Sequence, residues 1–128
     1  MSDRRPHPSA LPPAVNLVVV AGTLSRPPIT QRVADGTDVL VLSLAVPPST
    51  GDGPPELVPV VVPDPPPWLD AAAVGVPLWV QGRVRRRFFR AAGRVASPTE
   101  VVAERVVRGA RRAEVRRHSA RLARQLDP

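Results

Sequence analysis

The sequence predicts an all-β fold, a small five-stranded Greek-key barrel. Five segments rich in valine and leucine are separated by breaks rich in glycine and proline, which is typical of short strands joined by turns. A helix-forming segment stands between the third and fourth of them, and a basic segment follows the fifth. With 128 residues the chain fits one domain with tails.

The first strand follows a polar arm. Residues 1–14 are rich in Pro, Ser and Arg and are predicted to be disordered, and the barrel domain is predicted to cover 15–108. The run VNLVVVAGTL from Val15 is β-branched and predicts a strand. Gly22 inside it indicates a bulge or a sharp bend, which a small barrel needs in order to close. Residues 29–33 can form a short extension of this strand.

The middle of the chain predicts two strands and a helix. Val39–Val46 and Leu57–Val62 are the second and third strands. Pro59 indicates an edge position or a bulge, because proline has no N–H to donate to a neighbouring strand. Asp64 can cap a short helix over Trp68–Ala73, and the prolines that follow Asp64 are tolerated in a first helical turn.

The fourth strand, Leu78–Phe89, carries the strongest functional signal. Its sequence, LWVQGRVRRRFF, changes from apolar to arginine-rich and ends in two phenylalanines. Strand alternation puts residues 79, 81, 83, 85, 87 and 89 on one face, with Val80 and Val84 pointing into the barrel. Arginine attracts phosphate, and a Phe ring offers a base a flat face, so this strand predicts a single-stranded nucleic acid as the partner.

The chain ends in a fifth strand, Thr99–Val107, and a basic tail over 109–128. The tail is helix-prone, with Val115, Leu122 and Leu126 near one face and arginine at most other positions. Two interpretations stay open: a solvated, partly helical tail, or a functional basic segment.

Composition narrows the class of protein. The net charge is +7, all 18 cations are arginines, and this balance favours an anionic partner. Cysteine is absent, so there is no disulfide framework. His7 and His118 are isolated, so we expect no metal and no cofactor. No phosphate-binding loop and no Ser/His/Asp order is present, which predicts a protein that is not an enzyme.

The N-terminus indicates where the protein acts. Prolines interrupt any apolar run after the first arginines, so residues 1–14 do not form a secretory signal, and no apolar segment elsewhere approaches the length of a membrane span. We therefore expect a cytoplasmic, nucleoid-associated protein that does not bind membranes.

Five strands with a helix between the third and fourth is the order of an OB-fold. From Val15 to Val107 the chain resembles the bacterial single-stranded DNA-binding protein family. The motifs that carry the resemblance are VNLVVVAGTLSRPP, ADGTDVLVLSLAV, WLDAAAVGVPLWVQGRVRRRFF and GRVASPTEVVAERV, and RRRFFR looks like an actinobacterial-type branch.

The resemblance implies a function and a set of site residues. It predicts binding of single-stranded DNA, with little sequence preference, in DNA replication, recombination or repair. It places Arg85, Arg87 and Phe89 where the family contacts single-stranded DNA. Together with Arg83, which shares their strand face, these residues would line the groove, helped by Arg32 and Arg94. Trp79 and Gln81 fall where the family packs subunits, which implies a homo-oligomer, a tetramer or a dimer. For Trp79 a second interpretation stays open, that of a residue buried within its own chain.

The chain also departs from the family. Leu57 and Pro63 replace aromatic residues that are common there, and Val41 replaces a common asparagine. The end, RLARQLDP, is basic where replicative members carry an acidic tip, so the chain looks like a short accessory paralogue. Two alternatives stay open. One is an interaction module that has lost DNA affinity and assembles with a full-length paralogue; the other is an RNA- or ribosome-associated basic protein.

Overall fold

The computed structural model describes residues 14–86, 89–91, 94–96, 98–109 and 112–126. The arm predicted over 1–14 lies outside these residues except for Ala14. Eight strands and one helix are observed among them: β1 Val18–Leu24, β2 Ile29–Arg32, β3 Asp38–Val46, β4 Glu56–Val62, β5 Pro77–Arg86, β6 Phe89–Ala91, β7 Arg94–Ala96, β8 Thr99–Arg108 and α1 Arg112–Leu126.

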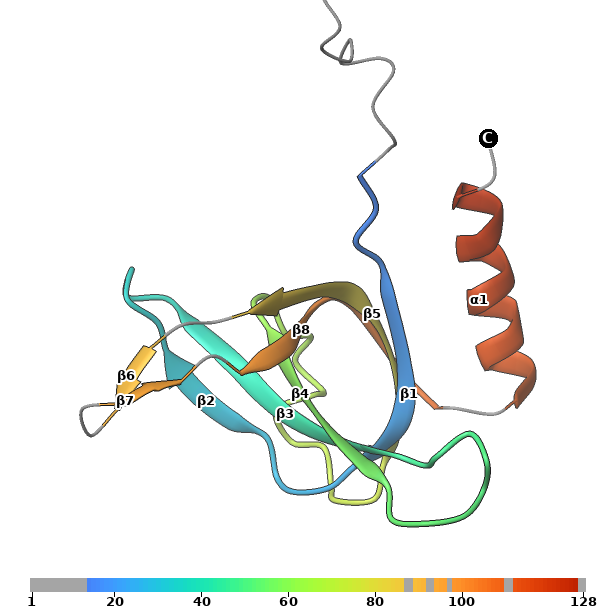
Figure 1. Cartoon of the computed structure of the whole chain (residues 1–128), viewed down its shortest axis with the longest axis horizontal. Coiled ribbons are helices and arrows are strands. Elements are labelled where there is room, and N and C mark those ends of the chain that lie inside the picture. Colours follow the sequence, from blue (N-terminus) through green and yellow to red (C-terminus); the bar gives the residue numbers. More distant parts are fainter. Residues whose placement is uncertain (1–13, 87–88, 92–93, 97, 110–111, 127–128) are drawn as a thin grey trace, which may run out of the picture.

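The main sheet closes into a five-stranded barrel (Figure 1). The sheet has six strands in the order β1-β5-β8-β4-β3-β2. An additional pairing of β1 with β3 closes the ring, so β1, β5, β8, β4 and β3 form the barrel and β2 extends the sheet beside β3. β1 pairs with the end of β3 at Ala45, whereas β2 pairs with its start from Asp38 to Val41. β2 therefore continues along β3 where β1 leaves it, which confirms the predicted extension of the first strand.

Two glycines allow strands to approach closely enough for closure. Gly22 pairs with Leu78 of β5, and the next residue of β1 pairs with Ala45 of β3. A Cβ at Gly22 would collide with the carbonyl oxygen of Ala45, and a Cβ at Gly82 would collide with that of Val102. Gly22 therefore lies where β1, still paired with β5, also comes against β3, and the β1–β5 register passes through it without a bulge.

The core fills the barrel with alternate residues of each strand. Its buried cluster draws on β1, β3, β4, β5 and β8: Leu24, Leu40, Leu42, Leu44, Val60, Val62, Leu78, Val80, Val101 and Ala103. Val80 is fully buried, as predicted, but Val84 is 41% exposed. Val84 lies opposite Val101 on the inward side, near the end of β5, where the core no longer covers it.

The prediction of a helix over Trp68–Ala73 is wrong. This segment is a series of turns, in which the Leu69 N–H donates to the Pro66 carbonyl (3.0 Å) and the Ala72 N–H to the Leu69 carbonyl (3.1 Å). Such i→i+3 bonds suit a short segment, because nucleating a full helix is costly and the preceding prolines donate no N–H. Leu69 and Ala72 belong to the buried core cluster, so the turns pack against the barrel core without forming a helix.

The predicted strand boundaries hold to within a few residues except in the fourth strand. β5 ends at Arg86, Arg87 and Phe88 lie outside the described residues, and Phe89 begins the separate hairpin of β6 and β7. Pro59 is exposed and lies at a local edge, as predicted. It pairs with β3, whereas the pairing of β4 with β8 covers only Val60 and Val61.

The basic tail forms α1, which lies outside the barrel beside β1 (Figure 1). Val115, His118, Ser119 and Leu122 share one side of this helix and are half-buried. The His118 ring lies 4.9 Å from the ring of Trp79 on β5, measured between centroids. α1 therefore turns its half-buried stripe toward the outer face of the barrel.

Candidate nucleic-acid interface

The outer face of β5 has two unlike halves. Alternate residues from Trp79 to Arg85 point away from the core, because their neighbours Leu78 and Val80 are fully buried on the opposite face of the strand. Trp79 is only 1% exposed, whereas the side chains of Arg83 and Arg85 are 48% and 44% exposed. The accessible half of this face is therefore the arginine half, which leads directly to the hairpin of β6 and β7.

Arg85 is held by a buried carboxylate on the neighbouring strand. It lies opposite Glu100 of β8, and its Nε and Nη2 atoms donate to Glu100 Oε1 at 3.2 and 2.7 Å. Glu100 is 5% exposed, so its charge needs this partner. A guanidinium has five N–H donors, so the contact leaves Arg85 with donors to spare.

Arg83 has a looser partner. Its Nη1 atom lies 3.6 Å from Glu104 Oε1, and both side chains are about half-exposed. The other oxygen of Glu104 accepts a hydrogen bond from Gln81 Nε2 at 3.2 Å. Glu104 is the extra residue in the irregularity of β8, between the partners of Gln81 and Gly82. This bulge places the carboxylate between the Gln81 and Arg83 side chains.

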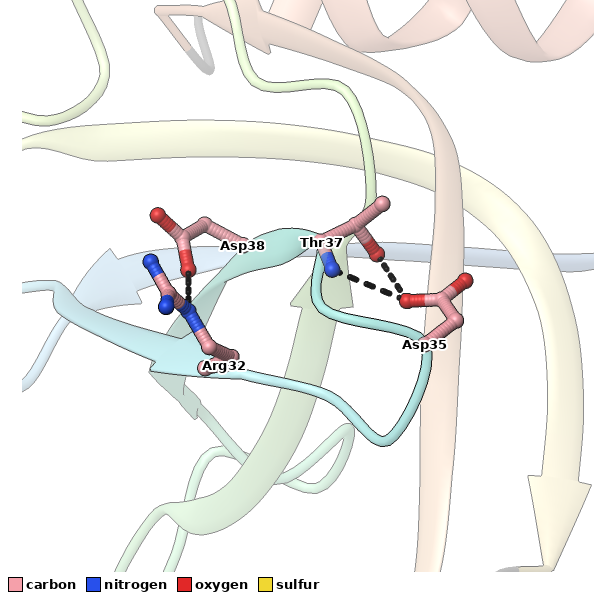
Figure 2. Close-up of polar contacts among 4 residues, drawn as sticks. All are labelled: Arg32, Asp35, Thr37 and Asp38. Carbon is pink, nitrogen blue, oxygen red and sulfur yellow. Dashed lines mark hydrogen bonds and ion pairs between the residues drawn. The ribbon is translucent and has the colours of Figure 1, made fainter.

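Arg32 is also paired, at the far end of β2. Its Nε atom donates to Asp38 Oδ1 at 3.2 Å across the hairpin that joins β2 to β3 (Figure 2). The same hairpin is fixed by Asp35, whose Oδ1 atom accepts from the backbone N–H and the hydroxyl of Thr37 at 2.9 and 2.6 Å. These two hydrogen bonds lower the pKa of the Asp35 carboxyl below its ordinary value.

The pairing changes the electrostatics of the predicted groove. Each of the three predicted arginines whose side chains are described, Arg32, Arg83 and Arg85, holds a carboxylate. A phosphate must therefore compete with Asp38 for Arg32 and with Glu104 for Arg83. At Arg85 it must share the guanidinium with Glu100. Because exposed ion pairs contribute only about 0–1 kcal/mol, competition at Arg83 and Arg32 costs little.

The other predicted site residues fall on or beside the hairpin. Phe89 and Arg94 begin β6 and β7, which pair in the register Phe89↔Ala96 and Ala91↔Arg94, so the two residues belong to one small unit. Their side-chain positions, and Arg87 as a whole, lie outside what the structure describes.

A second accessible surface lies on β3 and β4. Leu57 is 63% exposed and, with Pro59, Ser43 and Arg26, borders a hollow of about 430 Å³. Leu57 has no aromatic face, so this surface can pack against a base but cannot stack on it. Arg26 at its border was not predicted as a site residue; the only signal is its place in the break after the first strand.

The two residues predicted to form a subunit interface differ in exposure, because Trp79 is buried and Gln81 is half-buried. Trp79 is covered by His118, and its Nε1 atom is buried with no hydrogen-bond partner among the described residues. Gln81 is half-buried and lines a hollow of about 330 Å³ together with Leu122 and Gln125 of α1. Trp79 and Gln81, which were predicted to face another subunit, thus both lie next to α1 of their own chain.

Sequence reasoning missed three residues that position this face. Glu100 and Glu104 hold Arg85 and Arg83, and only the strand register reveals these pairs. Asn16 lies ahead of β1 and exchanges two hydrogen bonds of 2.9 Å with the backbone of Val84, which ties the chain entering β1 to the arginine half of β5. Its place at the head of the motif VNLVVVAGTL was the only available signal.

Two kinds of feature are absent from the part of the chain that the structure describes. No group of three His, Cys, Asp or Glu side chains there could hold a metal ion. Nor does that part contain a helix with the length and apolar character to cross a membrane.

Comparisons with known proteins point to one group. No protein-family model and no curated protein matches the chain. The wild-type single-stranded DNA-binding protein from Thermus aquaticus is 26% identical over 76% of this chain and 41% of its own length, with a TM-score of 0.58. A deletion mutant of that protein gives 26% identity over 76% of this chain and 42% of its own length, with a TM-score of 0.59.

A third structure extends the likeness. The Plasmodium falciparum single-stranded DNA-binding protein, solved with single-stranded DNA, is 18% identical over 78% of this chain and 99% of its own, with a TM-score of 0.63, and supports the fold alone. This chain spans less than half the length of the Thermus aquaticus proteins. The chain forms a closed five-stranded barrel of the OB-fold type, and this barrel is similar to those of the single-stranded DNA-binding proteins above.

Proposed function

We propose that this chain binds single-stranded DNA, with little sequence preference, along the outer face of β5 and the hairpin of β6 and β7. The observation that carries the proposal is the half-exposed pair Arg83 and Arg85, on the strand that leads into the hairpin bearing Phe89 and Arg94. The barrel around them is like that of proteins named for binding single-stranded DNA.

The chemistry of binding follows from the ion pairs. Arg83 exchanges the exposed carboxylate of Glu104 for a phosphate, while Arg85 keeps Glu100 and offers its remaining N–H donors. Each phosphate contact on a single strand contributes about 0.7 to the slope of log affinity against log salt. Arg87, Arg94 and Arg32 extend this phosphate track.

Base contacts are few on this surface. Phe89 supplies one stacking platform, worth about 1–3 kcal/mol per stacked base. Leu57 gives only an apolar contact where an aromatic ring would stack. Binding therefore depends mainly on phosphates and is sensitive to salt.

The experiment is fluorescence anisotropy with a labelled oligo-dT of roughly 35 nucleotides, long enough for several OB-fold sites. We compare the wild type with Arg83→Ala and Phe89→Ala, and use Arg83→Lys as the matched control because lysine keeps the charge. Both alanine variants weaken binding several-fold and the lysine variant does not. Equal affinity for all four proteins would reject this face as the site.

We further propose that the chain works as a homo-oligomer, a dimer or a tetramer, because one OB-fold contacts few nucleotides. An interface through Trp79 requires α1 to move, since Trp79 is 1% exposed beneath it, whereas Gln81 is reachable at the edge of α1. DNA replication, recombination or repair in the cytoplasm, beside a full-length paralogue, would supply the single strands.

One observation favours a second candidate, an interaction module without strong DNA affinity. The described arginines of the predicted groove are all engaged by carboxylates, and Leu57 offers no stacking face. A micromolar or tighter complex with oligo-dT argues against this candidate; no detectable complex at low salt supports it.

A further inference from the structure

The solvent side of α1 carries a row of arginines. Arg117, Arg121 and Arg124 are all exposed and are separated by four and three residues, the spacing that places side chains on one side of a helix. At a rise of 1.5 Å per residue, the row extends over about 10 Å. It is therefore a compact cationic surface.

The packing of α1 sets the direction of this row. His118 stacks near Trp79, and Val115, Ser119 and Leu122 are half-buried on the same side. At about 100° per residue, Arg117, Arg121 and Arg124 project from the opposite side of the helix. The arginine row consequently points away from the barrel and is separate from the outer face of β5.

The row differs electrostatically from the barrel arginines. Arg32, Arg83 and Arg85 each hold a carboxylate. Among the residues that the structure describes, no carboxylate pairs with Arg117, Arg121 or Arg124. Like charges three or four residues apart destabilise a helix slightly, so an anionic ligand that neutralises them would also stabilise α1.

We propose that α1 is a second nucleic-acid site, which binds the phosphate backbone of duplex DNA through Arg117, Arg121 and Arg124. His118 faces the barrel, and the helix has no Phe, Trp or Tyr, so α1 reads charge and has no platform for unpaired bases. Duplex DNA carries about one charge per 1.7 Å of its axis, the denser phosphate array for such a row.

The outer face of β5 and the arginine row of α1 together suit a junction between single-stranded and duplex DNA. A chain that holds a single strand on β5 and a duplex on α1 favours the boundary between single-stranded and duplex DNA. This consequence rests on the function proposed above, but duplex binding by α1 does not.

The test measures anisotropy of the full chain with a labelled duplex of roughly 20 base pairs over a salt series. The triple variant R117A/R121A/R124A lowers the slope of log affinity against log salt by about 2–3, at about 0.9 per lost contact. Its affinity for oligo-dT stays within about twofold of wild type. Alanine is a good helix former at exposed positions, and circular dichroism verifies that α1 remains.

A matched control and four outcomes make the result decisive. R117K/R121K/R124K keeps the charges and retains duplex binding. Unchanged duplex affinity in the alanine variant overturns the proposal, as does an equal loss for duplex and oligo-dT. Binding of the wild type to anionic phospholipid vesicles but not to duplex overturns it in favour of a membrane surface. Duplex binding with the expected slope but no oligo-dT binding supports α1 as a site and rejects the proposed function of β5 instead.

Discussion

Arg85 of β5 donates two hydrogen bonds to a single carboxylate oxygen of Glu100, directly opposite on β8. The carboxylate is 5% exposed and the arginine side chain 44% exposed, so the pair lies at the boundary between protein and solvent. A residue expected to contact DNA is therefore also part of the barrel wall, and its replacement affects stability as well as binding.

Replacing Arg85 tests this double role. Arg85→Ala leaves the buried Glu100 charge without its partner and lowers the free energy of unfolding by about 2 kcal/mol. This is less than the roughly 3–5 kcal/mol of a fully buried pair, because water reaches the arginine side. In the double variant with Glu100→Gln, the unpaired charge is gone and part of the loss is recovered. Urea denaturation of the wild type, of Arg85→Ala, of Glu100→Gln and of the double variant measures the coupling between the two residues. A loss in the double variant equal to the sum of the two single losses would contradict it.

Releasing Arg83 should strengthen binding. Glu104→Gln removes the carboxylate that competes with phosphate for Arg83, at half-exposed positions where folding depends little on the pair. We expect affinity for oligo-dT to rise about 1.4- to fivefold, which corresponds to the roughly 0.2–1 kcal/mol of an exposed pair. Asp52→Asn changes the net charge equally in a distant exposed loop and serves as the control. An equal gain in both variants would show only a net-charge effect.

Closure of the barrel depends on Gly82. Gly82→Ala puts a Cβ against the Val102 carbonyl inside the β5–β8 pairing, so backbone must shift. We expect a loss of more than about 3 kcal/mol, near the upper end of single-residue effects. Gly53→Ala has open space but a positive φ of 99° and costs about 1–2 kcal/mol. Similar melting temperatures for the two variants would contradict the close approach.

Contact between α1 and the barrel can be read from tryptophan fluorescence. In a Trp68→Phe background, Trp79 is the only tryptophan, and it is 1% exposed beneath His118. His118→Ala removes that cover, so acrylamide quenching increases about twofold or more, whereas Arg117→Ala on the solvent side leaves it unchanged. Strong quenching before any substitution would mean that α1 does not cover Trp79 in solution.

The strands were predictable because short runs rich in valine and leucine, bounded by Gly and Pro, favour strands over helices. The clearest case is β3, in which Leu40, Leu42 and Leu44 point into the core. The segment Trp68–Ala73 was not, since its composition suits a helix and only tertiary packing of Leu69 and Ala72 decides for turns. Burial of Trp79 depended on where α1 docks, which no local pattern encodes.

The positions of Arg83 and Arg85 on the outer face of β5 were predictable, but their ion pairs were not. The order of Arg83 and Arg85 along β5 followed from alternation. Their partners Glu100 and Glu104 followed from the register of β8, which the bulge at Glu104 shifts by one residue. A sequence without register cannot show which carboxylate meets which arginine.

The most direct test of the central claim is a titration of the isotope-labelled chain with unlabelled oligo-dT of roughly 15 nucleotides, followed by backbone amide chemical shifts. If the outer face of β5 and its hairpin bind single-stranded DNA, the largest shifts fall on Arg83, Arg85, Phe89 and Arg94, while the amides of α1 change little. Shifts confined to α1, or no shifts at low salt, would contradict single-stranded DNA binding by the barrel.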